Sequence, residues 1–148
     1  MAWGNLKKNR ISLNNHIYFI TFNTLDRATA FNHFETANLF CQQLKINEMN
    51  TYCHWVTWVL MPDHFHGLVR ITDTPITKVI QDLKGRSAFL INKQLSKKGK
   101  FWQSQFYDHA IRSDENLKDI SRYIVANPLR KNIVTNIKDY PYWNSDYL

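Results

Sequence analysis

The sequence predicts one α+β domain in which helices cover one face of an antiparallel sheet, and two patterns along the chain support this class. Apolar residues recur at helical spacing in two long segments, 34–49 and 76–98. Shorter segments rich in β-branched and aromatic residues have the composition of strands, namely 16–23, 51–60, 64–71 and 106–112. With 44% hydrophobic and 21% charged residues, the 148-residue chain fits a single globular domain over 1–148.

The two ends of the chain differ from this regular core. Residues 1–15 are polar and basic and are expected to form an arm, and residues 135–148 form an aromatic tail. A last helix is expected to start with Ser113 as its N-cap and to end near Asn127, because Pro128 disfavours helix in the residue before it. The resulting order βαββαβα is compatible with a ferredoxin-like antiparallel sheet.

Two histidines one residue apart mark the hairpin VLMPDHFHGLVR. Side chains alternate along a strand, so His64 and His66 should project from the same face, roughly 6–7 Å apart. The same parity places Trp55, Val59 and Leu68 on that face. Pro62 and Asp63 suit a tight turn, and parity makes Asp63 a turn residue opposite the histidines. Two imidazoles so placed could bind one cation, although two strand histidines without a metal, one of them half-buried and hydrogen-bonded, remain the alternative.

The segment RYIVANPLRKNIV offers candidates for a third ligand and for a reacting group. Tyr123 and Asn127 are four residues apart and would lie on one helix face if the helix reaches Asn127. Two imidazoles and an amide oxygen, with no thiolate, suit Mg²⁺ or Mn²⁺. Tyr123 could then attack a phosphate next to the ion. The alternative is that Tyr123, on an apolar helical stripe, is a core or boundary residue.

The net charge favours a polyanionic partner. Lys and Arg number 19 against 12 Asp and Glu, a formal charge of +7. Aromatic residues stand among the basic ones, a mixture suited to phosphate contact and base stacking, although a solvated basic face over an aromatic core would look the same. The candidate DNA contacts are Lys84, Arg86, Lys97, Lys98, Lys100, Trp102, Arg112 and Arg130.

The composition also gives expectations for the cellular location of the protein and for disulfide or zinc sites. No apolar run approaches the roughly 18 residues of a membrane span, and the first residues lack the apolar segment of a signal peptide. We therefore expect a cytoplasmic protein with no membrane contact. Cys41 and Cys53 form no CxxC spacing, so neither a disulfide framework nor a zinc knuckle is indicated.

Two separated motifs resemble one known family. MPDHFHGLV resembles the His-hydrophobic-His (HUH) motif of the IS200-like, single-tyrosine transposases. FWQSQFYDHAIRSDENLKDISRYIVANPLRKNIV resembles the second signature of the REP-associated tyrosine transposases. The resemblance implies that His64 and His66 bind the metal, that Tyr123 is the nucleophile, and that Asn127 stands where relatives use Gln as a further ligand.

The resemblance also implies a substrate. Members of the family act on single-stranded, hairpin-forming repeat DNA, cleave beside the hairpin and form a covalent 5′-phosphotyrosine, working as a monomer or a homodimer. This chain departs from the pattern at Asp63, where relatives commonly have Asn, and at 129–132, where many have a Gly-containing turn.

Two other functional classes remain in view. A replication-initiator or relaxase nuclease would share the histidine pair and the tyrosine, but such initiators are usually joined to helicase domains, for which 148 residues leave no room. A non-enzymatic ferredoxin-like nucleic-acid-binding module would stack bases on sheet aromatics, and the chain has no KGFGFVxF-like strand motif for that role.

Overall fold

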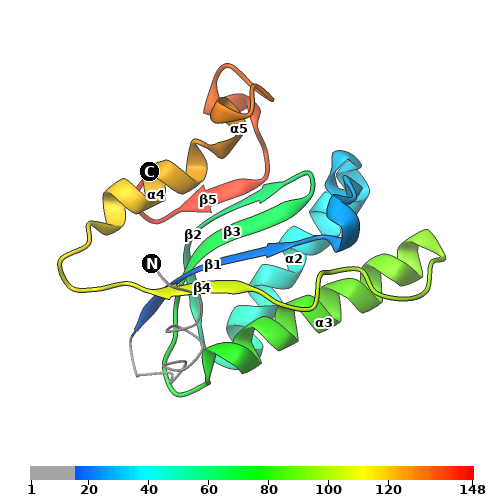
Figure 1. Cartoon of the computed structure of the whole chain (residues 1–148), viewed down its shortest axis with the longest axis horizontal. Helices are drawn as coiled ribbons and strands as arrows, with labels where there is room; N and C mark the ends of the chain where they lie inside the picture. The colour runs from blue at the N-terminus through cyan, green and yellow to red at the C-terminus, as the bar shows by residue number, and fades with distance from the viewer. Residues whose placement is uncertain (1–15) are drawn as a thin grey trace.

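A five-stranded antiparallel sheet forms the centre of the computed structural model, which describes residues 16–148 (Figure 1). The strand order is β4-β1-β3-β2-β5. The strands are β1 (Ile17–Asn23), β2 (His54–Met61), β3 (His64–Arg70), β4 (Tyr107–Ala110) and β5 (Trp143–Ser145). The helices are α2 (Phe34–Thr51), α3 (Ile76–Leu95), α4 (Leu117–Val125) and α5 (Asn127–Arg130), with short 3-10 turns η1 (Leu25–Arg27), η2 (Ala30–Asn32) and η3 (Ile137–Asp139). The basic arm expected at 1–15 lies outside the described residues.

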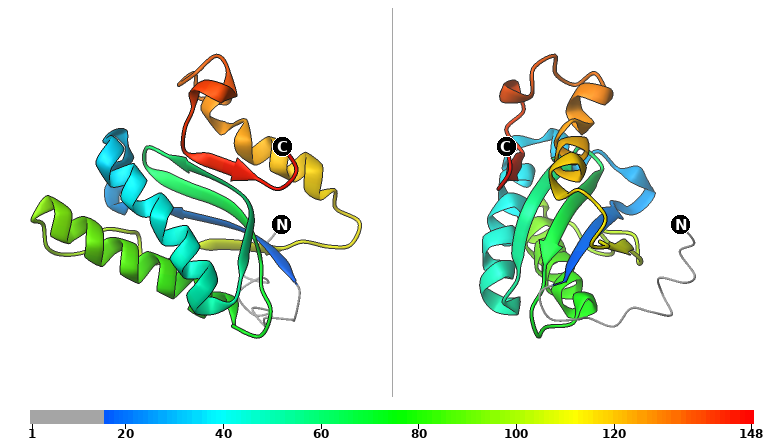
Figure 2. Two further views of the ribbon diagram at one scale, coloured as in Figure 1. Left: turned by 180° about the vertical axis from the view of Figure 1, so that it is seen from behind. Right: turned by 90° about the vertical axis from the view of Figure 1, so that its left-hand side faces the viewer.

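The predicted fold class is confirmed. The first four strands and the helices α2 and α3 follow the expected order, and both long helices lie on one side of the sheet (Figure 2). Between them and the sheet lies the larger hydrophobic core, which includes Phe22, Phe40 and Phe65. Within residues 16–148, no helix combines the length and the apolarity needed to cross a membrane.

The other face of the sheet is also partly covered, which the simple pattern did not include. Helix α4 packs on β2, and Ile124 joins a second cluster with Val59 and Leu68. The Thr57 hydroxyl lies 2.7 Å from the hydroxyls of both Ser121 and Ser145, so hydrogen bonds tie β2, α4 and β5 together. Since α2 and α3 already occupy the first face, the apolar side of α4 is buried on the second. The aromatic tail supplies η3 and β5.

A β-bulge corrects one parity assignment. The register of β2 against β3 shifts between Trp55 and Thr57, so Trp55 pairs with Val69 and belongs to the core under α2 and α3, not to the histidine face. Gly67 makes room for the Trp55 ring, because a Cβ at position 67 would lie 2.7 Å from Trp55 Cζ3. The bulge therefore brings a large ring onto β3 at a point where only glycine fits.

Two helix ends also differ from expectation. The N-cap of α4 is Asn116, whose side chain accepts a hydrogen bond from the Asp119 amide at 3.1 Å, so the assignment to Ser113 is wrong. Helix α3 ends at Leu95 rather than near Lys98, because Ser96 adopts a left-handed conformation with φ of 53°.

Candidate active site

The two histidines stand side by side at the start of β3, as the strand parity predicts. His64 pairs with Asn23 of β1 and His66 with Thr21, so both project from the same face as α4. Their ring centroids are 4.5 Å apart and their planes meet at 79°. Because β3 has a neighbour on each side, the backbone that carries the pair is fixed by the sheet.

Asp63 holds the first ring. Nδ1 of His64 donates to Asp63 Oδ1 at 2.6 Å, and Arg27 Nε donates to Asp63 Oδ2 at 2.9 Å. Burial raises the pKa of Asp63, but the hydrogen bonds from His64 and Arg27 outweigh that effect and lower the pKa below its usual value. The interpretation of Asp63 as only a turn residue is therefore wrong: its carboxylate sets the tautomer and orientation of His64.

Thr21 holds the second ring. Its hydroxyl lies 2.7 Å from Nδ1 of His66. With both Nδ1 atoms engaged, neither Nε2 atom has a hydrogen-bond partner anywhere in residues 16–148. Burial lowers the pKa of both imidazoles, that of His66 to about 3. Both rings are therefore neutral near pH 7, the state in which imidazole binds metals.

Asn127 lies on a different helix from Tyr123. Helix α4 ends at Val125, and Asn127 is the first residue of the short α5, so the condition for a shared helix face is not met. Asn127 is buried, and its Nδ2 donates to the Ile124 carbonyl at 3.0 Å. Its Oδ1 accepts no hydrogen bond from the part of the chain described here. That oxygen is therefore available as a ligand.

Tyr123 points to solvent, with 59% of its surface exposed. The Arg130 guanidinium carbon lies 4.0 Å from the centroid of its ring, a cation–π contact between α4 and α5. Helix α5 contacts β2, the strand that pairs with the histidine strand β3. Tyr123 is thus an accessible phenol in contact with the guanidinium of Arg130.

The donor atoms fit a hard or borderline divalent cation. No group of three His, Cys, Asp or Glu suited to a metal occurs among the described residues. The predicted ligand atoms are two imidazole nitrogens on β3 and one amide oxygen on α5, and by donor type they suit Mg²⁺ or Mn²⁺.

Three of the predicted DNA contacts have partners within the protein. Trp102 is only 3% exposed, and its Nε1 donates to the Ser87 hydroxyl at 3.0 Å, so it is a core residue. Lys84 Nζ donates to the carbonyls of Gln103 and Gln105 at 2.7 and 3.2 Å. Arg86 forms an ion pair with Asp82 one turn earlier. A sequence pattern in which aromatic and basic residues alternate does not show which of these side chains are buried in the folded protein.

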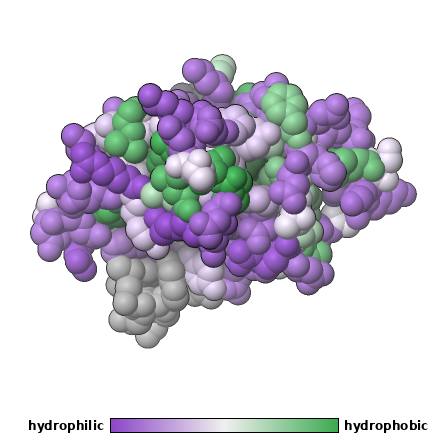
Figure 3. Space-filling view, turned by 90° about the horizontal axis from the view of Figure 1, so that it is seen from above, coloured by the Kyte–Doolittle hydropathy of each residue, from purple (hydrophilic) through white to green (hydrophobic). Residues whose placement is uncertain are grey.

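The other predicted DNA contacts remain accessible. Arg112 is exposed and lies 3.2 Å from Asp114, an ion pair that solvent screens. The remaining members of the predicted set are also exposed, namely Lys97, Lys98, Lys100 and Arg130. From above, mostly hydrophilic residues surround smaller apolar patches (Figure 3).

The fold is a five-stranded α+β domain with a histidine pair on a central strand and an exposed tyrosine on α4. The family model described as "Transposase IS200 like" matches residues 12–127, and the chain belongs to this family. It is an enzyme of the transposase class. This membership decides against both the replication-initiator or relaxase nuclease and the non-enzymatic binding module.

Individual relatives agree with this family. A Haemophilus influenzae protein described as a candidate REP-associated tyrosine transposase is 28% identical over 142 residues, covering 85% of this chain and 77% of that protein. The Escherichia coli REP-associated tyrosine transposase is 24% identical over 87 residues, covering 57% of this chain and 50% of that protein.

A solved structure shares the fold. A REP-associated tyrosine transposase bound to a REP hairpin superposes with a TM-score of 0.76 at 20% identity, covering 90% of this chain and 79% of that one. At this identity the likeness concerns the fold alone.

Proposed function

We propose that the chain is a metal-dependent endonuclease and strand transferase that cleaves single-stranded DNA beside a hairpin. The observation that supports this most strongly is the pair of neutral imidazoles, His64 buried and His66 half-buried, whose Nε2 atoms have no partner in residues 16–148 while Asp63 and Thr21 hold their Nδ1 atoms. A histidine pair that served only the core would be expected to use both ring nitrogens within the protein. A hairpin partner is supported by the structural neighbour, which is bound to a REP hairpin.

His64, His66 and Asn127 would hold Mg²⁺ or Mn²⁺. When bound, such an ion would polarise the scissile phosphate and stabilise the negative charge that develops on it. Asp63 and Thr21 keep the imidazoles oriented. Burial keeps them unprotonated, so their lone pairs stay available at neutral pH.

Tyr123 would supply the nucleophile. Its phenol oxygen attacks phosphorus, the bond to the 3′ oxygen breaks, and the phenol proton passes through solvent to that oxygen. The products are a strand with a free 3′-hydroxyl and a 5′-phosphotyrosine. Attack by a 3′-hydroxyl then releases the tyrosine, so strands are exchanged without an external energy source. The exposure of Tyr123 lets a phosphate reach it without any unfolding of α4.

The nucleophile is tested with Tyr123→Phe. Incubation with a hairpin oligonucleotide that carries single-stranded flanks should give a covalent protein–DNA adduct on a denaturing gel, and Tyr123→Phe should abolish the adduct while equilibrium binding persists. Tyr52→Phe is the matched control, because Tyr52 is also strongly exposed and lies at the end of α2. An adduct of undiminished yield from Tyr123→Phe would refute the assignment.

The metal site is tested separately. His64→Ala and His66→Ala should each abolish cleavage and reduce Mn²⁺ binding measured by the free-ion electron paramagnetic resonance signal. Cleavage that continues at the same rate in EDTA would show that the histidine pair has another role.

A further inference from the structure

A cavity of about 450 Å³ lies between η1–η2 and the loop that follows α3. Three lysines of that loop line it, Lys97, Lys98 and Lys100, and we call the cavity the lysine pocket. None of its lining residues is acidic. The volume falls in the range of small-ligand sites, roughly 300–1,000 Å³, and is large enough for one nucleotide.

The lysine pocket combines free cations with an apolar surface. In residues 16–148, no hydrogen bond or ion pair engages the ammonium groups of Lys97 and Lys98, whereas Lys100 donates to the Ser104 hydroxyl. Leu25 and Leu95, both 37% exposed, line the same cavity. A ligand that covers these leucines while meeting two ammonium groups must carry both an apolar face and negative charge.

Hydrogen bonds give the loop a defined shape. The Lys97 amide donates to the Asn92 carbonyl, and Asn92 Nδ2 donates to the Gly99 carbonyl, each at 2.8 Å. Gly99 adopts a φ of 94°, which glycine tolerates and other residues rarely adopt. The Leu25 amide donates to the Phe101 carbonyl at 2.9 Å, so the two walls of the pocket are joined directly. The pocket is therefore formed before any ligand arrives.

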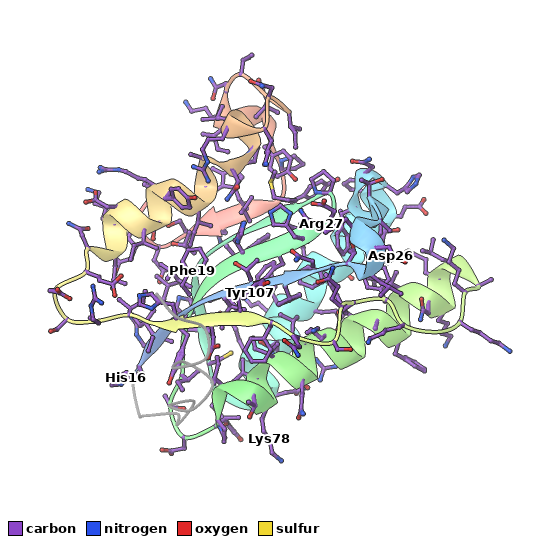
Figure 4. All side chains as sticks on the ribbon, viewed as in Figure 1. His16, Phe19, Asp26, Arg27, Lys78 and Tyr107 are labelled. Carbon is purple, nitrogen blue, oxygen red and sulfur yellow. The ribbon has the colours of Figure 1, made fainter. Side chains whose placement is uncertain are left out.

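One wall of the lysine pocket also reaches the histidine site. Arg27 of η1 is hydrogen-bonded to Asp63, which holds His64, and the Thr24 amide donates to the Asp63 carbonyl at 3.0 Å. Arg27 lies at the end of β1 away from His16 (Figure 4). The lysine pocket and the histidine site are therefore connected through η1 and Asp63.

We infer that the lysine pocket binds one unpaired nucleotide of the single-stranded flank, with its base against Leu25 and Leu95 and its phosphates at Lys97 and Lys98. Nucleotides have the required apolar face and charge, and single-strand binding sites commonly combine the two contacts. The choice of DNA as partner rests on the proposed function. The lysine pocket would then hold the base and the backbone of one nucleotide at a second position, outside the histidine site.

The lysines are tested with Lys97→Ser/Lys98→Ser and two labelled oligonucleotides, a hairpin with a single-stranded flank and the same hairpin with blunt ends. Fluorescence anisotropy should show that the dissociation constant for the flanked hairpin rises about tenfold, and that the slope of log affinity against log salt falls by about 0.7 per lost contact. Binding of the blunt hairpin should change less than about twofold. Lys45→Ser/Lys78→Ser is the control, because both side chains are exposed and Lys78 lies at the opposite end of α3 (Figure 4).

Equal losses on the two hairpins would overturn the proposal, since the lysines would then contact the duplex or act only through overall charge. An unchanged affinity for the flanked hairpin would overturn it as well. Thermal unfolding of each variant checks that the exposed substitutions leave the fold intact.

The base contact is tested with Leu25→Gln and Leu95→Gln together with an abasic scan of the flank. Removal of one particular base should weaken binding to the original protein several-fold but have little further effect in the leucine variants. Absence of any such position would contradict base binding. Covalent adduct formation at Tyr123 is a separate readout: its absence would refute the proposed chemistry, whereas a flank-specific effect of the lysines would still support the pocket.

Discussion

The histidine end of β3 and the tyrosine segment α4–α5 are built in opposite ways. His64 is buried and His66 is half-buried. Both belong to a strand with neighbours on both sides, and each has a hydrogen-bond partner from β1 or the turn. Tyr123 is exposed and has a single aromatic–cation contact, with Arg130. The difference indicates that metal ligands require a fixed position before the substrate arrives, whereas a nucleophile must be reached by a phosphate and later leave it.

On the histidine side, the largest expected effect is the loss of stability caused by Gly67→Ala. The added Cβ would meet the Trp55 ring at 2.7 Å within the core, and overpacking of this kind costs about 1–3 kcal/mol. Urea unfolding should show that loss. Gly85→Ala is the control of opposite sign, because a Cβ there meets nothing within 4 Å and alanine favours an exposed helix interior by about 0.5–1 kcal/mol. Similar stability in both variants would show that β3 is not tightly fixed.

The next effect concerns Asp63. Asp63→Ala removes the acceptor for His64 Nδ1 and should weaken Mn²⁺ binding about 10- to 100-fold, the usual cost of losing an outer-shell partner. Asp63→Asn keeps an oxygen acceptor and should retain most of the affinity. Titration followed by the free Mn²⁺ signal gives both values. If Asn and Ala weaken binding equally, the carboxylate acts through its charge and not by orienting the ring.

A smaller effect is a pH dependence of the metal-free protein. Burial, followed by the nearby positive charges, lowers the pKa of His66 to about 3, against about 6.5 in an unfolded chain. Between these values the unfolded state binds more protons, so the free energy of unfolding should fall as pH decreases from 6.5 towards 3. The contribution of one such group is at most about 1.4 kcal/mol per pH unit. In EDTA, His66→Gln should have a shallower slope than the original protein; identical slopes would mean that His66 titrates normally.

The sequence predicted the histidine side well because one local rule governs it. Alternation along a strand places His64 and His66 together whatever the rest of the chain does. The groups that hold those histidines could not be predicted. Thr21, which contacts His66, and Arg27, which holds Asp63, reach the site only through the antiparallel register of β1 and the turn after it. The bulge that moves Trp55 to the other face has no signal in the alternating pattern.

The tyrosine side was less predictable. A spacing of four places residues on one face only within one continuous helix, and the break after Val125 separates Tyr123 from Asn127. The aromatic residues of the basic loop gave no sign of burial, so Trp102 was assigned to DNA although it packs in the core. Motif resemblance identified the family, which the family model confirms, and it proposed the reacting residues. The burial and the hydrogen bonds of those residues required the fold.

The most direct test of the division between fixed ligands and an accessible nucleophile is peptide mapping of the covalent adduct by mass spectrometry. The chain has seven tyrosines, so the position of the modification is informative. We expect the nucleotide 5′-phosphate on the peptide that contains Tyr123, formed only when Mg²⁺ or Mn²⁺ is present. A phosphate on any other tyrosine, or the same yield in EDTA, would contradict the proposed site.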